Sequence, residues 1–233
     1  MGKKLRQQRR GKGSNAYSKL PGTFDISVSY GSKPISGEVI EIFNHTGHSA
    51  PIMKLQYEDF SYGYMIAPEG IKVGDKVYIN SNNFTLGSVL KLSDIPEGTP
   101  IYNIESKPGD GGKYVRVAGT SAVLSSHIGD KAIVVMPSKA EVALSANSRA
   151  QLGVVAGGGI TEQPLLKAGK NHYRMHALNR MWPKIRGVKS NPVDHPFGGK
   201  QHHKGKSSMT SRNAPPGRKV GNIAARRVGR KKR

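Results

Sequence analysis

Short runs of β-branched and aromatic residues, separated by Gly, Pro, Asn and Asp, fill the chain from residue 24 to residue 155. No 3.6-residue period of useful length occurs in this region, so the pattern predicts an all-β fold. A first set of strands is expected at 24–30, 37–43, 51–57, 62–66 and 76–80. Five strands in about 60 residues are the content of a small barrel, and the oligonucleotide-binding fold is one such barrel.

A second set of strands follows a joint rich in Pro and Gly at 92–100. These strands are expected at 101–105, 114–117, 122–126, 132–136, 140–144 and 153–156. Residues 133–144 form two of them, joined as a hairpin at Pro137–Lys139. Because sets of about 60 residues are only marginally stable alone, we expect the two barrels to pack together.

The strand pattern stops after residue 160. Residues 164–180 are expected to hold a short helix broken at Gly169, and residues 181–233 an extended arm with Gly and Pro turns. The chain therefore divides into a basic N-terminal extension (1–23), an oligonucleotide-binding-type barrel (24–92), a second small barrel (93–165) and a basic C-terminal arm (166–233).

Charge is segregated along the same divisions. Residues 1–19 hold seven Lys and Arg and no acid, residues 20–165 hold 11 bases and 14 acids, and residues 166–233 hold 19 bases and one acid. Repulsion within the two basic tracts opposes their compaction in isolation, so they need a polyanion to fold against. A solvated tail or a targeting signal would explain the last eight residues at most. Aromatic residues, His and Gly-Pro turns are interleaved among the other charges, which favours a nucleic-acid partner.

Several classes of protein are excluded or disfavoured. The chain has no Cys, so it has no disulfide, thiolate metal site or Cys nucleophile. No run of about 18 apolar residues predicts a membrane span, and the start lacks the apolar stretch of a secretory signal. We therefore expect a cytoplasmic protein. The segment Gly199–Ser207 is not a phosphate loop, because five residues lie between its glycines where a phosphate loop has four.

No cofactor or metal is predicted. His172 with His176, and His202 with His203, lack a third ligand at a recognisable spacing.

The loop 107–119 is rich in Gly and carries Lys107, Lys113 and Arg116. Gly permits close approach of the backbone to a phosphate, and the basic side chains supply charge. The alternative is a flexible hairpin tip, and residue types do not separate the two. Arg149 is a further candidate phosphate contact.

The string from Arg186 to Gly199 contains the arm's only acid, Asp194, beside His195. One interpretation is that Asp194 orients or charges His195 for catalysis or RNA contact. The alternative, which residue types favour, is a turn in which Asp194 accepts backbone N–H bonds and His195 fills space.

Several motifs along the chain carry a resemblance to a known family. They are Ile66–Asp75, Asn103–Gly109, Ala118–Thr120, Arg149–Gly153, Arg186–Gly187, Asn191–Pro196 and Gly198–Gly199. Together they resemble the family of the second large-subunit ribosomal protein, in its archaeal and eukaryotic branch. The resemblance implies an oligonucleotide-binding barrel, an SH3-like barrel, and two termini threaded into large-subunit ribosomal RNA near the peptidyl transferase centre, with Asp194 and His195 nearest to that centre.

This sequence departs from the family pattern at three places. Phe197 stands where many members have a second His, Gly199-Lys-Gln-His-His replaces a Gly-Gly-Gly-Glu-Gly run, and Lys189 takes the place of a small residue. These departures leave His195 available but weaken the case for a fixed histidine pair.

We therefore expect a structural ribosomal protein that supports large-subunit assembly, a monomer in contact with large-subunit ribosomal RNA and neighbouring ribosomal proteins, and not an enzyme. The expected RNA contacts are Arg6, Arg9, Arg10, Lys12, Lys107, Lys113, Arg116, Arg149, Arg174, Arg180, Arg186, Asn191, Asp194, His195, Gly198, Gly199, Lys200, Arg212 and Arg218. Tyr173 and Trp182 are candidates for stacking on bases. Two rivals remain: a general nucleic-acid packaging protein, and an enzyme that uses Asp194 and His195 as an acid–base pair.

Overall fold

The computed structural model describes residues 2–13, 17–18, 25–31, 35–81, 83–160, 162–199, 203 and 206–227. The chain forms two compact units. We call Pro21–Pro164 the β unit, and we call Met1–Leu20 together with Leu165–Arg233 the basic unit. The basic unit holds 26 Lys and Arg and a single acid, Asp194, whereas the β unit holds 11 bases and 14 acids.

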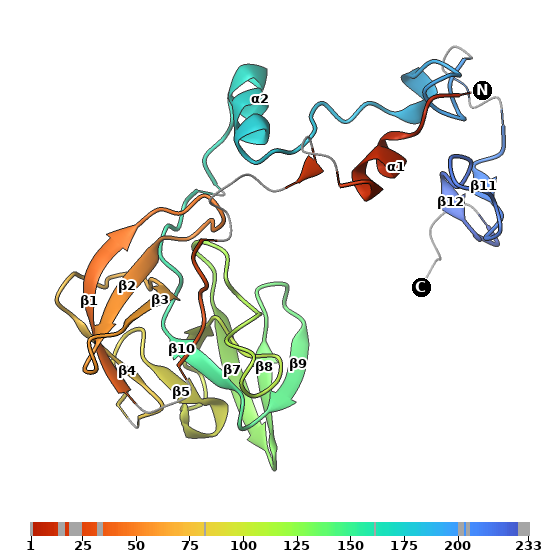
Figure 1. Ribbon diagram of the computed structural model, residues 1–233. Coiled ribbons are helices and arrows are strands. Elements are labelled where there is room, and N and C mark those ends of the chain that lie inside the picture. The colour runs from red at the N-terminus through yellow and green to blue at the C-terminus, as the bar shows by residue number, and fades with distance from the viewer. Residues whose placement is uncertain are drawn as a thin grey trace. The chain divides into compact units, whose positions relative to one another are not determined.

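The first half of the β unit contributes four strands that pair antiparallel with one another (Figure 1). Its strands are β1 (Ile35–Phe43), β2 (Ile52–Tyr57), β3 (Tyr62–Ile66) and β4 (Lys76–Ile79). β1 lies between β2 and β4, and its pairing with β2 shifts register between Val39 and Glu41. Met53 and Leu55 on β2 enter one core while Ile52 enters another, as the alternation of side chains along a strand requires.

The second half continues the same sheet. It contains β5 (Val89–Lys91), a 3-10 turn η2 (Leu92–Asp94), β6 (Pro100–Tyr102), β7 (Ala122–Ile128), β8 (Lys131–Val135), β9 (Glu141–Ser145) and β10 (Arg149–Leu152). The strand order over the ten described strands is β3-β2-β1-β4-β5-β10-β6-β7-β8-β9. β10 pairs with β5 on one side and with β6 on the other, so the last strand of the unit in sequence lies between two earlier strands.

Three apolar clusters fill the β unit. One collects Val39, Met53, Leu55, Met65, Val77 and Ile79 from the first half. A second collects Leu90, Ile101, Leu124, Val134, Leu144 and Leu152 from the second half. A third contains Ile52 and Ile66 from the first half with Tyr102, Ala118 and Val155 from the second. The two halves therefore have separate cores and share a third, as expected for two small folds that pack together.

The all-β prediction is confirmed, although several strand positions were wrong. Residues 25–31 form no strand, yet Val28 and Tyr30 are buried in the apolar clusters. Around Tyr114 there is only an isolated bridge to Ile104. The strand expected at 153–156 is instead β10, four residues earlier, and β5 was not predicted at all. Phe24 and Lys33 lie outside the described residues.

The basic unit has little regular structure. It contains α1 (Arg6–Gly11), α2 (Ala168–Ala177), a 3-10 turn η3 (Gly187–Lys189) and a parallel pair of two-residue strands, β11 (Met209–Thr210) and β12 (Asn222–Ile223). α2 is not broken at Gly169, which is its second residue, where a helix leaves the backbone N–H unpaired in any case. Leu5 and Phe197 are the only buried apolar side chains among the described residues of this unit.

Candidate nucleic-acid interface

Positive charge in the basic unit is almost without internal compensation. Among its described residues the one salt bridge joins Lys3 Nζ to Asp194 Oδ1 at 4.0 Å, and both side chains are largely exposed. An exposed pair at that distance contributes little to stability. The net positive charge of this unit therefore favours an external polyanion.

The segment from Arg186 to Gly199 folds as a series of tight turns. The Asn191 carbonyl accepts the N–H groups of Asp194 (2.9 Å) and His195 (3.1 Å), and the His195 carbonyl accepts the N–H of Gly198 (3.0 Å). Upstream, Ser190 N donates to the Gly187 carbonyl at 3.2 Å. These bonds fix the backbone of the Asp194–His195 turn, by which we mean residues 190–199.

Two glycines let this turn close. A Cβ at Gly187 would overlap the ring of His195, and one at Gly198 would overlap the backbone carbonyl of Ser190 and lie 2.6 Å from the Asn191 oxygen. The ring of His195 therefore covers Gly187, and the chain at Gly198 passes directly over Ser190 and Asn191. Neither position has room for a larger residue without a shift of the turn.

His195 is held as a neutral ring with a defined tautomer. Its Nδ1 accepts the N–H of Phe197 at 3.1 Å, which places the ring proton on Nε2. Burial lowers the pKa of His195, which further favours the neutral form. The Phe197 ring lies 5.2 Å from the His195 ring, centroid to centroid, at an interplanar angle of 54°. Phe197 is itself buried, so it anchors the ring of His195 from inside the unit.

Asp194 does not act on His195 in this arrangement. Within the described part of the chain, no hydrogen bond or ion pair joins the two side chains, and the only ion-pair partner of Asp194 is Lys3. The backbone N–H groups of Asp194 and His195 go to the Asn191 carbonyl, and those of Phe197 and Gly198 go to His195, so these bonds do not use the Asp194 carboxylate. The geometry therefore offers no acid–base pair at these two residues.

The N-terminal segment Gly2–Leu5 is a structural part of this turn. Lys3 N donates to the Val193 carbonyl at 2.8 Å, and Gly2 packs against the same oxygen. The sequence gives no sign of this pairing except that Leu5 is an apolar residue in a basic tract. Lys3 and Leu5 thus belong to the candidate site, although no sequence pattern pointed to them.

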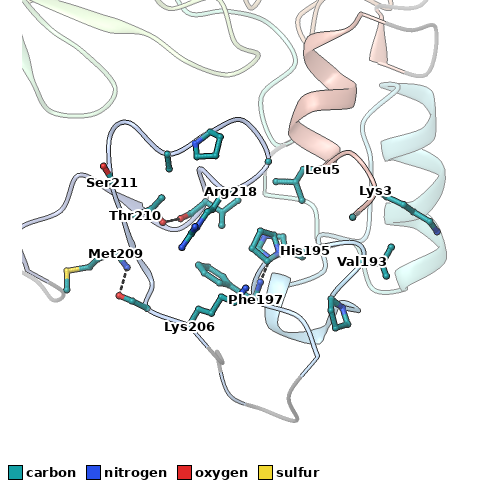
Figure 2. A pocket seen from close by; sticks show the side chains of 18 of the residues that line it. Lys3, Leu5, Val193, His195, Phe197, Lys206, Met209, Thr210, Ser211 and Arg218 are labelled. Carbon is teal, nitrogen blue, oxygen red and sulfur yellow. Dashed lines mark hydrogen bonds between the residues drawn. The ribbon is translucent and has the colours of Figure 1, made fainter.

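A cavity of about 700 Å³ opens beside the turn (Figure 2). Its wall is formed by the N-terminal segment, by Pro192–Val193 and His195–Phe197, and by the turns from Lys206 to Val220. We call it the arm cavity. Lys3, Lys206 and Arg218 line it, and no Asp or Glu lines it among the residues that the structure describes.

In the β unit, the Gly-rich loop at 106–112 is organised around two carboxylates. Asp110 accepts the N–H groups of Ser106, Lys107 and Gly112, and Glu105 accepts those of Gly109 and Gly111. These N–H groups are occupied inside the protein and do not form a phosphate cradle. The loop is held by its own hydrogen bonds and is not an open anion nest, although Lys107 on it and Lys113 directly after it are exposed.

Arg116 is half-buried, and its Nη1 donates to the Gly112 carbonyl at 3.1 Å. Arg149 is bound still more completely. Its guanidinium donates to Glu105 Oε1 from Nη2 at 2.7 Å and from Nε at 3.2 Å, and Nη1 donates to the Gly31 carbonyl at 2.7 Å. The geometry of both side chains favours a role inside the β unit, and their RNA contact stays a prediction.

Most of the other expected RNA contacts lie on the surface of the basic unit. The exposed members are Arg6, Arg9, Arg10, Lys12, Arg174, Arg180, Arg186, Asn191, Gly199, Arg212 and Arg218. Gly198 is half-buried, and Lys200 lies outside the described residues. Of the two stacking candidates, Tyr173 is 75% exposed, whereas Trp182 is half-buried with its ring 6.4 Å from that of His172.

Among the described residues, no group of three or more His, Asp or Glu side chains is placed to hold a metal ion. None of the described helices combines the length and apolar character needed to cross a membrane.

Comparison with known proteins gives a consistent result. A family model described as Ribosomal Proteins L2, C-terminal domain, matches residues 85–219. The chain is 43% identical over 236 residues to the large ribosomal subunit protein uL2 of Natronomonas pharaonis, covering 99% of this chain and 97% of that protein. It is 44% identical to the uL2 protein of Archaeoglobus fulgidus, covering 98% and 99%, and 42% identical to that of Haloarcula marismortui, covering 99% and 98%.

Proposed function

Because the chain belongs to the family of the large ribosomal subunit protein uL2, we propose that it is a structural constituent of the large ribosomal subunit in the cytoplasm. In this proposal it binds large-subunit ribosomal RNA as a monomer among neighbouring ribosomal proteins and supports subunit assembly and the peptidyl transferase region. It acts by neutralising charge and fitting shape, not by catalysis.

The observation that carries the proposal is the charge of the basic unit. With 26 Lys and Arg against one acid, and with only Leu5 and Phe197 buried among its described apolar residues, the unit has neither the charge balance nor the core of an independent domain. A surrounding polyanion supplies the missing stability, because a ligand that binds only the folded form shifts the folding equilibrium toward it. Each phosphate neutralised also releases counterions.

The contacts we propose are the exposed basic side chains of this unit: Arg6, Arg9, Arg10, Lys12, Arg174, Arg180, Arg186, Arg212 and Arg218, together with Lys107 and Lys113 of the β unit. The Asp194–His195 turn, with Asn191, Gly198 and Gly199, would approach the RNA backbone closely, and Lys200 follows it in sequence. Tyr173, with its exposed ring, is the better placed of the two candidates for stacking on an unpaired base.

For the β unit we propose an oligonucleotide-binding-type barrel at 24–92 and an SH3-like barrel at 93–165. The separate apolar clusters support this division, since one draws on residues 30–89 and the other on residues 90–152. The shared third cluster would hold the two barrels in a fixed relation, so that they present one surface to folded RNA.

Competition binding tests the proposal against a general packaging protein. Labelled large-subunit ribosomal RNA is bound to the intact protein, and unlabelled large-subunit RNA or duplex DNA is added. We expect the RNA to compete much more strongly than the DNA, because shape as well as charge is recognised. Equal competition would favour the packaging protein. Salt titration gives a second measure, because the logarithm of the binding constant should fall with the logarithm of the salt concentration. The expected slope is roughly 0.7 to 0.9 per phosphate contacted.

A further inference from the structure

The arm cavity has a lining that suits a nucleotide. Its volume of about 700 Å³ lies within the usual range for small-ligand sites, about 300 to 1,000 Å³. The wall combines two rings, His195 and Phe197, with two long cationic side chains, Lys206 and Arg218. Figure 2 shows Arg218 between the Thr210–Ser211 turn and those rings. Both cationic side chains are exposed at the cavity, so a ligand that carries negative charge suits this wall better than an apolar one.

The hydroxyl groups on the wall are also arranged by their internal bonds. The Oγ atoms of Ser207 and Ser211 accept the N–H groups of Met209 and Asn213, both at 3.2 Å. Each hydroxyl proton therefore remains available to donate to a phosphate or ribose oxygen. Thr210 Oγ1 donates to the Val220 carbonyl, so it can only accept a further bond, for example from a ribose hydroxyl or a base amino group.

The rings are fixed before any ligand arrives. The ring of His195 packs against Gly187, and its Nδ1 accepts the N–H of Phe197. The ring of Phe197 packs against Gly221. A rigid, neutral imidazole is a surface on which a base can stack without losing conformational entropy. None of the described residues in the wall carries a negative charge that would repel a phosphate, and the neighbouring Asp194 is paired with Lys3.

We propose that the arm cavity holds a single unstacked nucleotide of RNA, with its base against His195 and its phosphate between Lys206 and Arg218. The inference rests on the proposed function and adds to it a defined pocket, built jointly by the N-terminal segment and the C-terminal arm. RNA is favoured over a free nucleotide because the surrounding unit is densely cationic, and that charge would hold the flanking phosphates of a strand.

The first test changes shape without changing charge. Ala214 lines the cavity, and Ala214→Trp would fill it, whereas Ala177→Trp alters an exposed residue of α2 that does not line it. The affinity of the intact protein for large-subunit RNA is measured across a salt series. Loss of one stacked base lowers affinity by about 5- to 150-fold. We expect that loss for Ala214→Trp with an unchanged salt slope, and no loss for the control.

A second pair of variants removes equal charge at two neighbouring places. Arg218 lines the cavity, while Arg212 lies between the lining residues Ser211 and Asn213 but is not itself part of the wall. Both Arg218→Ala and Arg212→Ala should reduce the salt slope. We expect only Arg218→Ala to weaken the binding that remains when affinities are extrapolated to 1 M salt.

Ultraviolet cross-linking of the assembled large subunit supplies a direct readout. After nuclease and protease digestion, mass spectrometry should find one nucleotide attached to the peptide that contains His195 and Phe197 in the wild type, and none in Ala214→Trp. Equilibrium dialysis with AMP and UMP tests whether the protein binds free nucleotides, and we expect no binding in the micromolar range.

The outcomes separate the two proposals. Failure of the wild type to bind large-subunit RNA would overturn the proposed function. If the wild type binds, an Ala214→Trp variant with unchanged affinity, or cross-links confined to other peptides, would overturn the nucleotide site alone. Tight binding of free AMP or UMP would overturn the assignment to RNA.

Discussion

The carboxylate of Glu105 is fully buried and accepts two hydrogen bonds from the guanidinium of Arg149, whose side chain is only 11% exposed. The same carboxylate accepts the backbone N–H of Arg149 and those of Gly109 and Gly111. Arg149 begins β10, the strand between β5 and β6. One ion pair therefore ties the Gly-rich loop to the strand that joins both halves of the β unit.

Removing one partner of this pair should destabilise the protein strongly. Arg149→Ala leaves a buried carboxylate with fewer donors, and breaking such a pair costs about 3 to 5 kcal/mol. Urea denaturation of the full chain, followed by circular dichroism of the β signal, measures the loss. Lys107→Ala, on the exposed side of the same loop, is the control and should change the free energy of unfolding very little. Equal stability of the two variants would contradict this role for Arg149.

The same pair predicts a dependence of stability on acid. Burial raises the pKa of Glu105, but hydrogen bonds from Arg149, Gly109 and Gly111 outweigh it and lower the pKa overall. A carboxyl group with a lowered pKa in the folded state stabilises the fold above its ordinary pKa, about 4.3, and this contribution disappears as pH falls through the folded value. The free energy of unfolding should therefore decrease below about pH 4.3, and Glu105→Gln should flatten that decrease.

His195 predicts a second dependence of stability on pH, and here the pKa is lowered by burial and not by hydrogen bonds. Burial lowers its pKa, so the unfolded chain binds a proton more readily than the folded one. The Asp194–His195 turn should lose stability as pH falls below about 6.5, the ordinary value for histidine, and the loss should level off below the folded pKa. An NMR titration of the ring should give a value below that of the same ring in urea. His195→Asn, which keeps an acceptor for the Phe197 N–H, should remove the dependence.

Two glycine substitutions should change local stability in opposite directions. Gly198→Ala places a Cβ on the Ser190 carbonyl, so the turn must open or shift. Gly169→Ala places a Cβ in open space at the second residue of α2 and should stabilise the helix, by less than the about 0.5 to 1 kcal/mol expected in a helix interior. Affinity for large-subunit RNA should fall for Gly198→Ala and not for Gly169→Ala. Equal affinities would argue against a functional role for the turn.

The N-terminal segment should be needed for order in the C-terminal turn. Leu5 is one of the two buried apolar side chains described in the basic unit, and replacing a buried Leu by Ala typically costs about 2 to 5 kcal/mol. Leu5→Ala should therefore speed hydrogen exchange of the Asp194 and His195 amides, which bond to Asn191. Unchanged exchange rates would show that the turn is held without this segment.

Local sequence patterns predicted the fold where side chains alternate regularly. The expected strands at 122–126, 132–136 and 140–144 correspond to β7, β8 and β9 because alternating apolar residues such as Val134 and Leu144 enter one core. Elsewhere, apolar residues are buried without belonging to a strand. Val28 and Val155 are buried in the shared third cluster, yet the first lies in no strand and the second forms only an isolated bridge.

The candidate site was predicted in its charge and not in its geometry. Counting Lys and Arg located the basic unit, because charge segregation is a property of the sequence itself. Residue types could not show that Arg149 bonds to Glu105, 44 positions away, or that Lys3 bonds to Val193. Such contacts depend on the folded path of the chain, and no local pattern encodes them.

The hydrogen bond from Lys3 to Val193 also orders events during synthesis. Lys3 can form this bond only after Val193, 190 positions further along the sequence, has been made. Throughout that interval the β unit can complete its sheet while the leading cationic segment remains unpaired and open to any nucleic acid nearby. The segment Gly2–Leu5 therefore reaches its native place only after the turn that contains Val193 has been made.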